Sequence, residues 1–298
     1  MTIKDVPVSS TREFFDVLED LRLKGVVFRG HRDAIHYRIT STLSRHHRAP
    51  YNPRTSWQVD KMLRHFLGNL QLVNHSLPFT EDNRRARLEF GRHYGIPSPL
   101  IDFSYSPYVA TFFAFNGVRP YDVDPSDQCA ICCVNMFAVA GVWSRTITKG
   151  FDGQVDGKKF TDEHNRFMYE VDDLFQDGYP PNILKFIPSP ASWNRRMRRQ
   201  LGCFLYDSLD YGCLGLKDLE DFLSQPEVPS VPSTDAIMLT KVLIPQKLGR
   251  EVMERLDVMN ISGTHLYDDH EGAAIDVINA YNYDRKSGQV WDLKPPST

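Results

Sequence analysis

The sequence predicts an α+β protein with a mixed β-sheet flanked by helices. Short apolar runs that are typical of strands are separated by longer segments in which apolar residues recur at helical spacing. Irregular stretches interrupt this order, and the elements interleave without a clean boundary or an internal repeat. We therefore expect residues 1–298 to form a single domain, with its core over about residues 20–280.

The first third of the chain predicts one strand among several helices. Residues 10–23 begin with Ser and Thr, which favour helix starts, and continue with apolar residues at helical spacing. Residues 25–30 are a short apolar run that ends in an arginine and a glycine, and we expect a strand there. Apolar residues on one face predict helices over residues 55–75 and 81–95.

The middle of the chain predicts two strands, a helix and a long irregular segment. Residues 100–103 fit a strand, and Pro107 is placed to start a helix, because proline is favoured in the first helical turn. Residues 129–139 have the composition of a buried strand. Between residues 144 and 190 Gly, Asp, Lys and Pro dominate. We expect an irregular insertion here, a lid or a loop that faces substrate.

The last third returns to regular structure. A strand-like run over residues 199–206 is followed by a linker rich in Pro and Ser over residues 225–234. Beyond the linker the pattern predicts, in order, a strand over residues 236–244, a helix over 245–259, a return segment over 260–267 and a final helix that begins near Glu271.

Composition and charge exclude several classes of protein. The chain is 41% hydrophobic and 24% charged, which is ordinary for a soluble globular protein. Its net charge of −3 argues against a polybasic nucleic-acid binder, so an anionic partner would need a local basic patch. The sequence has neither an apolar signal core nor a run of about 18 apolar residues, so we expect no membrane segment.

The cysteines indicate a reducing compartment. There are five, an odd number, and Cys129, Cys132 and Cys133 crowd into one expected strand. Since neighbours on a strand face opposite sides, Cys132 and Cys133 cannot easily pair. We therefore expect a cytoplasmic protein. The spacing of Cys129 and Cys132 suits a metal, but no second ligand pair accompanies it, so we expect no metal site.

Arg29 is the first candidate site residue. It stands at the end of a predicted strand, where its planar guanidinium could bind a phosphate or a ribose. The glycine that follows, Gly30, would let backbone or ligand approach closely. The alternative is a surface arginine at a turn between a strand and a loop.

Hydroxyl groups gather before the predicted helix at Pro107. They belong to Ser104, Tyr105 and Ser106. One of them is expected to cap the helix. Another could face a ligand, because the N-terminus of a helix favours anions.

Two other polar groups have a functional and a structural interpretation. His93 and Asp102 flank one strand and could act as acid and base, or they could form a hydrogen-bonded pair that fixes the end of a helix. Residues 37–45 carry five hydroxyls and two arginines. A loop that caps a helix is favoured there over a pocket wall or an anion-binding turn.

A cluster of arginines suggests an anionic partner. Four arginines occupy five positions, namely Arg195, Arg196, Arg198 and Arg199. Such blocks often contact phosphates, although a solvated face is the commoner outcome. A weaker cluster is formed by Arg84, Arg85 and Arg87.

Several motifs together resemble the FRG domain family, which is named for its Phe-Arg-Gly. They are, in chain order, Phe28-Arg29-Gly30, the segment 37–45, the segment 92–103, the helix start at Ser106-Pro107, Gln200-x-Gly202-x-Phe204 and Leu266-Tyr267-x-Asp269-x-x-Gly272. The resemblance spans about residues 20–280. The chain departs from the family pattern at Arg92, where glutamine is usual, and at Ser98 and Pro99, where threonine and arginine are usual.

A more distant resemblance is to ADP-ribosyltransferases and related toxins. These proteins carry an arginine and a glycine at the end of the first core strand, as Arg29 and Gly30 do here. A serine-x-serine segment then leads into a helix with a Val-Ala-x-x-Phe-Ala pattern, similar to residues 104–114. This resemblance implies a split mixed sheet of the ADP-ribosyltransferase type.

The resemblance also implies chemistry and site residues. In such transferases NAD is the substrate, nicotinamide leaves, and an acceptor attacks an oxocarbenium-like ribose. The implied catalytic residues are Arg29, His93, Asp102 and Gln200. The implied NAD-binding residues are Arg29, Gly30, Tyr94, Ser104, Tyr105 and Ser106. The implied acceptor-binding residues are Arg195, Arg196, Arg198 and Arg199.

The third part of the transferase pattern, a later glutamate, is missing. Gln200 stands at the expected strand, and an amide can bind a ribose hydroxyl but cannot stabilise a cation by charge. Glu163, Glu170 and Asp102 are the carboxylates that could replace it, and the sequence does not choose among them.

The resemblances imply an NAD-dependent ADP-ribosyltransferase that acts as a toxin or effector in bacterial conflict or phage defence. Its acceptor would be a macromolecule, with RNA or DNA favoured by the arginine cluster, and an antitoxin protein could be its partner. Two other functions stay open. One is a binding module without activity that recognises a nucleotide or an anionic partner, and the other is a nuclease that uses His93 and Asp102.

Overall fold

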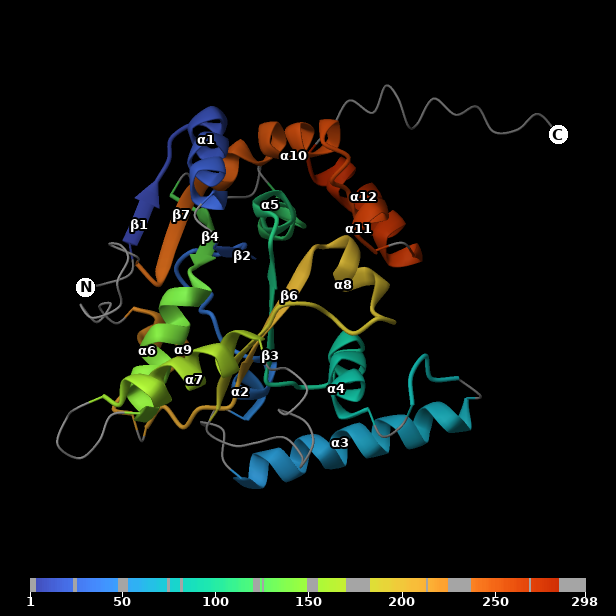
Figure 1. Ribbon diagram of the computed structural model, residues 1–298. Coiled ribbons are helices and arrows are strands. Elements are labelled where there is room, and N and C mark those ends of the chain that lie inside the picture. Colours follow the sequence, from blue (N-terminus) through green and yellow to red (C-terminus); the bar gives the residue numbers. More distant parts are fainter. Residues whose placement is uncertain are drawn as a thin grey trace.

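The computed structural model describes residues 4–23, 26–47, 53–73, 76–80, 83–119, 124, 126–148, 155–169, 183–212, 214–224, 237–267 and 269–283. In this part of the chain the strands form one mixed sheet in the order β1-β7-β4-β2-β3-β6-β5 (Figure 1). The strands are β1 (Lys4–Pro7), β2 (Val27–His31), β3 (Leu100–Ser104), β4 (Gln128–Val134), β5 (Leu184–Ile187), β6 (Gly202–Asp207) and β7 (Leu239–Pro245). β1 and β7 are parallel, and the other neighbours are antiparallel.

The two halves of the sheet meet at a single residue pair. β2 pairs with β4 along its whole length, and β3 pairs likewise with β6. Between β2 and β3 the one pair is Phe28 with Ser104. The sheet is therefore continuous where a split sheet was expected, but its two central strands part immediately beside this pair.

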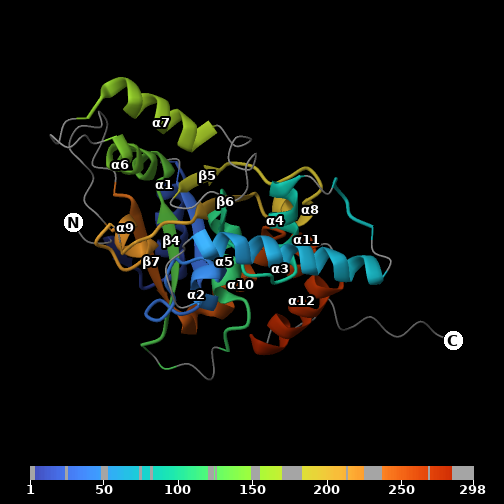
Figure 2. The ribbon, with the colours of Figure 1, turned by 90° about the horizontal axis from the view of Figure 1, so that it is seen from below.

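Helices cover both faces of the sheet, with α6 and α7 on one side and α5 and α10 on the other (Figure 2). The first face packs against α6 (Met136–Thr148), α7 (Gly157–Tyr169) and α9 (Leu219–Leu223). On the second face, α1 (Thr11–Arg22), α5 (Pro107–Phe115) and α10 (Gly249–Val258) pack around β2, β4 and β7. A separate apolar cluster joins α2 (Thr42–His47), α3 (Pro53–Leu72) and α4 (Arg84–His93) to β3, β5 and β6. The remaining helices are α8 (Arg195–Arg199), the 3-10 turn Gln246–Leu248, α11 (Gly263–Tyr267) and α12 (His270–Asn282).

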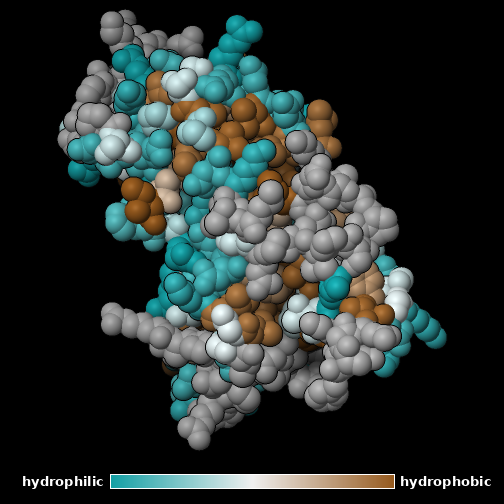
Figure 3. Space-filling model, turned by 90° about the vertical axis from the view of Figure 1, so that its left-hand side faces the viewer, coloured by the Kyte–Doolittle hydropathy of each residue, from teal (hydrophilic) through white to brown (hydrophobic). Residues whose placement is uncertain are grey.

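The surface and the cysteines add two observations. Hydrophobic and hydrophilic residues are interspersed on the face shown in Figure 3. No helix in the described ranges is both long and apolar enough to span a bilayer.

Cys132 and Cys133 pack into the clusters on opposite faces of the sheet, as strand alternation predicted.

The two helix starts that the sequence marked most clearly are confirmed. α1 begins after Ser10, whose hydroxyl accepts a hydrogen bond from the main-chain N of Glu13 at 3.2 Å. α5 begins at Pro107, and the hydroxyl of Ser106 accepts from the main-chain N of Val109 at 3.3 Å. Both are N-caps that satisfy a backbone donor of the first turn.

Some of the predicted elements were wrong. The strand expected over residues 129–139 ends at Val134, because the Asn135 side chain accepts from the main-chain N of Ala138 and starts α6. The segment 144–190 contains the end of α6, all of α7 and the edge strand β5, so it is not irregular throughout. The return segment 260–267 contains α11. The linker over residues 225–234 lies outside the described residues.

Gly30 is required by the packing of α5 on β2. A Cβ atom at this position would lie 2.0 Å from the main-chain oxygen of Ala110 and 2.6 Å from the main-chain nitrogen of Ala114. Only a glycine lets the helix backbone come this close. Gly30 was expected to let backbone or ligand approach closely, and here it admits the backbone of α5, which it fixes beside the end of β2.

Replacing Gly30 with alanine should lower the free energy of unfolding by about 2 kcal/mol or more, because the added methyl group overlaps main-chain atoms. Gly68 in α3 is the control, since a Cβ atom there meets nothing within 4 Å. Its replacement by alanine should raise helix stability by up to about 1 kcal/mol. Urea unfolding measures both changes, and wild-type stability of the Gly30→Ala variant would contradict the packing argument.

Candidate functional site

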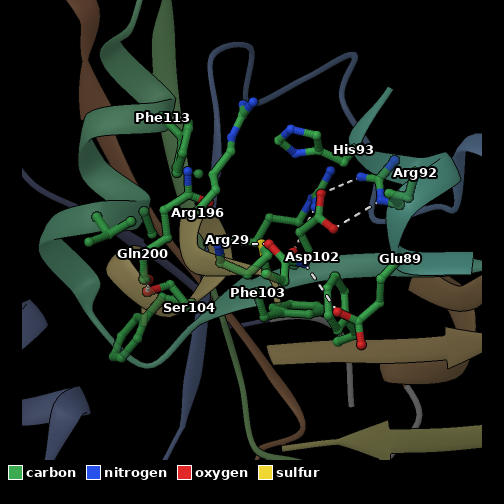
Figure 4. Close-up of a pocket in the computed structure, with 17 residues that line it drawn as sticks. Arg29, Glu89, Arg92, His93, Asp102, Phe103, Ser104, Phe113, Arg196 and Gln200 are labelled. Carbon is green, nitrogen blue, oxygen red and sulfur yellow. Dashed lines mark hydrogen bonds and ion pairs between the residues drawn. The ribbon is translucent and has the colours of Figure 1, made fainter. Parts of the chain in front are cut away.

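A cavity of about 350 Å³ opens where β2 and β3 part. Figure 4 shows its walls, which come from β2, β3, α4, α5, α8 and β6. The lining residues are Phe28, Arg29, Gly30, Glu89, Arg92, His93, Asp102, Phe103, Ser104, Val109, Ala110, Phe113, Asn194, Arg196, Met197, Gln200 and Phe204. Segments that are far apart in the sequence therefore meet at one site.

The side chain of Arg29 bridges the gap between the two central strands. Its Nη1 donates a hydrogen bond to the main-chain carbonyl of Asp102 on β3 at 2.7 Å, and its Nε donates to Nε2 of His31 at 3.2 Å. The first bond links β2 to β3 where they share no further ladder pair. A guanidinium has five N–H donors. Two of the five donors bind described residues of the protein, so three N–H groups are left for a ligand.

Arg29 carries a half-buried positive charge. Burial lowers the pKa of Arg29 to about 10; Asp102 opposes this shift, and Arg92 and Arg45 add to it. The group is still a cation at neutral pH. Among the described residues it contacts the main chain of Asp102 and the ring of His31, and no carboxylate oxygen is within ion-pair distance. The cavity therefore offers a cation to an anionic ligand.

Asp102 is bound by a different arginine. Nε of Arg92 donates to Oδ1 of Asp102 at 2.9 Å, and Nη2 of Arg92 binds Oδ2 (Figure 4). Burial would raise the pKa of the Asp102 carboxyl, but the charge and hydrogen bonds of Arg92, and then the charge of Arg29, outweigh burial and hold it below its ordinary value. Asp102 is therefore ionised at neutral pH.

The predicted pairing of His93 with Asp102 is not formed. Both residues line the cavity, but the carboxylate of Asp102 is held by Arg92. Burial, followed by the charge of Arg196, lowers the pKa of His93, so its ring is neutral at pH 7. The structural alternative, a hydrogen-bonded pair of His93 and Asp102 that fixes the end of a helix, is thus absent from the described contacts.

Glu89 lines the cavity but was not singled out from the sequence. Its side chain is buried, and its carboxylate accepts from Nε of Arg85 at 3.0 Å, the main-chain N of Ala191 at 3.0 Å and Nδ2 of Asn194 at 3.1 Å. Because Asn194 caps α8, Glu89 fixes α8 against α4. The one signal in the sequence was the spacing of Arg85 and Glu89, four residues apart on a predicted helix.

Ser104 and Gln200 hold the cavity wall together with their polar groups. The Ser104 hydroxyl donates to the main-chain carbonyl of Gln200 at 2.7 Å and accepts from the main-chain N of Ser106 at 2.9 Å. Nε2 of Gln200 donates to the main-chain carbonyl of Leu266 at 3.3 Å. Both predicted site residues lie in the lining, and their hydrogen bonds connect β3, α8 and α11.

Arg196 is the one member of the 195–199 cluster in the cavity lining. Its guanidinium carbon lies 3.9 Å from the centre of the Tyr267 ring, and its Nη1 donates to Oε2 of Glu271 at 3.0 Å. The exposed members of the cluster are Arg195, Arg198 and Arg199. The cluster thus contributes one arginine to the cavity and three to the surface beside it.

Three of the residues predicted to bind NAD lie outside the lining. Tyr94 is exposed, and its ring contacts the rings of Phe90 and His93. The Tyr105 hydroxyl donates to the main-chain carbonyl of Pro188 at 2.9 Å. The hydroxyl of Ser106 caps α5. Of Ser104, Tyr105 and Ser106, the three hydroxyl-bearing residues predicted to bind NAD, only Ser104 lines the cavity.

The three carboxylates that could replace the missing glutamate lie in different places. Asp102 lines the cavity. Glu163 lies on α7, outside the cavity lining, and pairs with Arg166 at 3.6 Å. Glu170 lies outside the described residues. Asp102 is therefore the described member of this set that a ligand in the cavity could touch.

His31 accepts a hydrogen bond from Arg29 but does not line the cavity, and the sequence did not single it out. It is buried, and its Nδ1 lies 3.7 Å from Sγ of Cys132. Burial, followed by the charges of Arg29 and Lys241, lowers the pKa of His31 to about 3. The neutral ring can therefore accept the Arg29 hydrogen bond. The only sequence signal was its place two residues after Arg29, on the same strand face.

The fold and the site define a mixed α/β domain with a cationic cavity at a gap in its sheet. The family model described as FRG domain matches residues 24–122, so the chain contains an FRG domain, as the motifs predicted. The matched range holds β2, α4, β3 and α5, whereas the later motifs around Gln200 and Gly272 lie beyond it. Comparison with curated proteins and with solved structures gave no match. No cluster of His, Cys, Asp and Glu suited to a metal ion occurs among the described residues.

The ion pair of Asp102 with Arg92 should make stability depend on pH. Because the folded-state pKa of Asp102 lies below its unfolded value of about 3.9, the pair contributes stability above about pH 4 and loses it as the pH falls through the folded-state pKa. The Asp102→Asn variant should therefore be less stable than wild type at pH 7, and the difference should shrink below pH 4. Urea unfolding at several pH values measures this.

The matched control is Asp16→Asn, which changes an exposed carboxylate on α1. Its free energy of unfolding should be close to that of wild type at every pH measured. A stability difference between Asp102→Asn and wild type that stays constant from pH 7 to pH 3 would contradict the assignment.

Proposed function

We propose that the cavity binds NAD as a substrate and that the protein transfers ADP-ribose to a macromolecular acceptor, as a toxin or effector in bacterial conflict or phage defence. The observation that carries this proposal is the state of Arg29. A half-buried guanidinium with three unused donors, and no carboxylate bound to it among the described residues, is suited to a phosphate.

The apolar side of the cavity suits a nucleoside. Phe103, Val109 and Phe113 contribute apolar side chains to its lining. Its volume of about 350 Å³ is near the lower end of ligand pockets, so it would hold one nucleotide half of NAD. We assign the nicotinamide ribose and its phosphate to the cavity, and the adenosine half to the rim beside Arg196.

The transfer needs little from the protein besides placement and charge. The bond between ribose C1′ and the nicotinamide nitrogen breaks, and its electron pair passes to that nitrogen, which loses its positive charge. A nucleophile of the acceptor forms a bond to C1′ and releases its proton to water. The ionised carboxylate of Asp102 is the group we place beside the developing positive charge.

A second candidate function, a binding module without turnover, is favoured by one observation. Both carboxylates in the lining are already held by arginines, Glu89 by Arg85 and Asp102 by Arg92. A carboxylate that is already ion-paired stabilises the positive charge developing on the ribose less than an unpaired carboxylate does. The module would use the same Arg29 cavity to recognise a nucleotide or an anionic tail.

Replacing Arg29 with alanine should lower NAD turnover by about 100-fold or more, because the variant loses the anchor of the phosphate. Release of nicotinamide from NAD, in the presence of cell lysate, is the measurement. Arg38→Ala is the matched control, since Arg38 pairs with Asp218 and Asp221, outside the cavity lining. It should retain turnover.

Two checks make this test decisive. Melting curves of both variants establish that they are folded, and Arg29→Lys keeps the charge while it removes the planar donor fork. Wild-type turnover in Arg29→Ala would contradict the role of Arg29. Binding of NAD by the wild type without release of nicotinamide would favour the binding module.

A further inference from the structure

Two neighbouring helices, α4 and α8, are unusually rich in arginine. α4 carries four arginines and one acidic residue, and α8 carries four arginines and none. The chain as a whole has a net charge of −3. A local concentration of this kind is the electrostatic footprint expected for a polyanion.

The one acid of α4 offsets the charge of Arg85 but adds no carboxylate to the surface. Glu89 is buried beneath the two helices, where it binds Arg85 and Asn194. The outward side chains of α8 include Arg195 and Arg198, both exposed. We refer to the surface of α4 and α8 as the arginine wall.

The arginine wall borders the mouth of the cavity. Arg92 and His93 from α4 and Arg196 from α8 belong to both the wall and the cavity lining. In Figure 1, α8, α4 and α3 follow one another along one side of the molecule, and α3 carries the exposed Arg64. A chain of phosphates on the wall would thus have one nucleotide at the cavity mouth.

An exposed aromatic ring lies on the same wall. Tyr94, at the C-terminal cap of α4, is 52% exposed, and its ring centre lies 4.9 Å from that of His93 in the cavity lining. Exposed aromatic rings among basic side chains are the platforms on which unpaired bases stack. In a duplex the bases are paired and stacked on one another, so a single strand more readily offers the free base that such a platform needs.

Acidic residues limit the wall on its other side. Beyond Arg196 lie Glu271, which pairs with it, and Asp269, which caps α12. These carboxylates would repel a polyanion. They leave the direction along α4 toward α3 as the path that the charges favour.

We propose that the acceptor is a single-stranded nucleic acid, bound along the arginine wall by its phosphates with one base on Tyr94. The transfer step rests on the proposed function, whereas the binding does not. The wall binds with little dependence on sequence, because phosphate contacts carry no base readout. Its affinity falls as salt rises, because bound arginines release counterions from the strand.

The test measures binding of a fluorescein-labelled single-stranded oligonucleotide by anisotropy, without NAD, over a range of salt concentrations. The double variant Arg195→Gln/Arg198→Gln should bind more weakly than wild type. The slope of log K against log salt should become shallower by about 1.4, since each lost phosphate contact removes about 0.7. Tyr94→Ala should weaken binding without a change in this slope.

The control is Arg12→Gln/Arg22→Gln, which removes the same charge from α1. It should match wild type in affinity and slope. Equal binding by the arginine-wall variant and the control, or tighter binding of duplex than of single strand, would overturn the proposal. So would labelled ADP-ribose that enters the protein fraction and not the nucleic acid. Oligonucleotide binding without NAD turnover would uphold the wall and contradict the transferase.

Discussion

The hydrogen bond from the Arg29 guanidinium to the main-chain carbonyl of Asp102 is the contact on which the site depends. The central strands share one ladder pair, so the main chain alone does not close the gap between them. Arg29 spans this gap, and Gly30 lets α5 pack against the same strand end. The arrangement leaves a cation partly buried without a bound carboxylate among the described residues, which costs free energy that an anion would recover. One side chain thereby serves both the sheet and the cavity.

The helices α11 and α12, far from β2 and β3 in the sequence, support the cavity wall. A Cβ atom on Gly272 would lie 2.4 Å from the main-chain oxygen of Gly263, so α11 and α12 pack main chain against main chain. This packing presents the carbonyl of Leu266 to the side chain of Gln200. The later motifs thus have a structural explanation that needs no ligand: they hold α11 against the cavity wall. The family match ends before them, yet the cavity requires them.

Local signals made part of this structure predictable. Pro107 and the preceding serine marked the start of α5, and the Phe-Arg-Gly motif marked Arg29, because capping and strand ends are set by neighbours in sequence. The roles of Glu89 and His31 were not predictable, since each also depends on a partner from elsewhere in the chain, Asn194 for Glu89 and Cys132 for His31. Asp102 was identified as a site residue, but its binding to Arg92 depends on how α4 docks on β3. The helix α7 was missed because its polar composition resembled a loop, although its few apolar residues pack against α6.

Calorimetric titration with NAD and with nicotinamide riboside tests the central claim most directly. The riboside has the same base and sugar but lacks the phosphates that Arg29 is assigned to bind. Hydrogen bonds to charged groups contribute about 1.5–3 kcal/mol, so NAD should bind about 10-fold to 150-fold more tightly than the riboside. Equal affinity of the two compounds, or no binding of NAD, would contradict the account of Arg29 as the anion anchor of this domain.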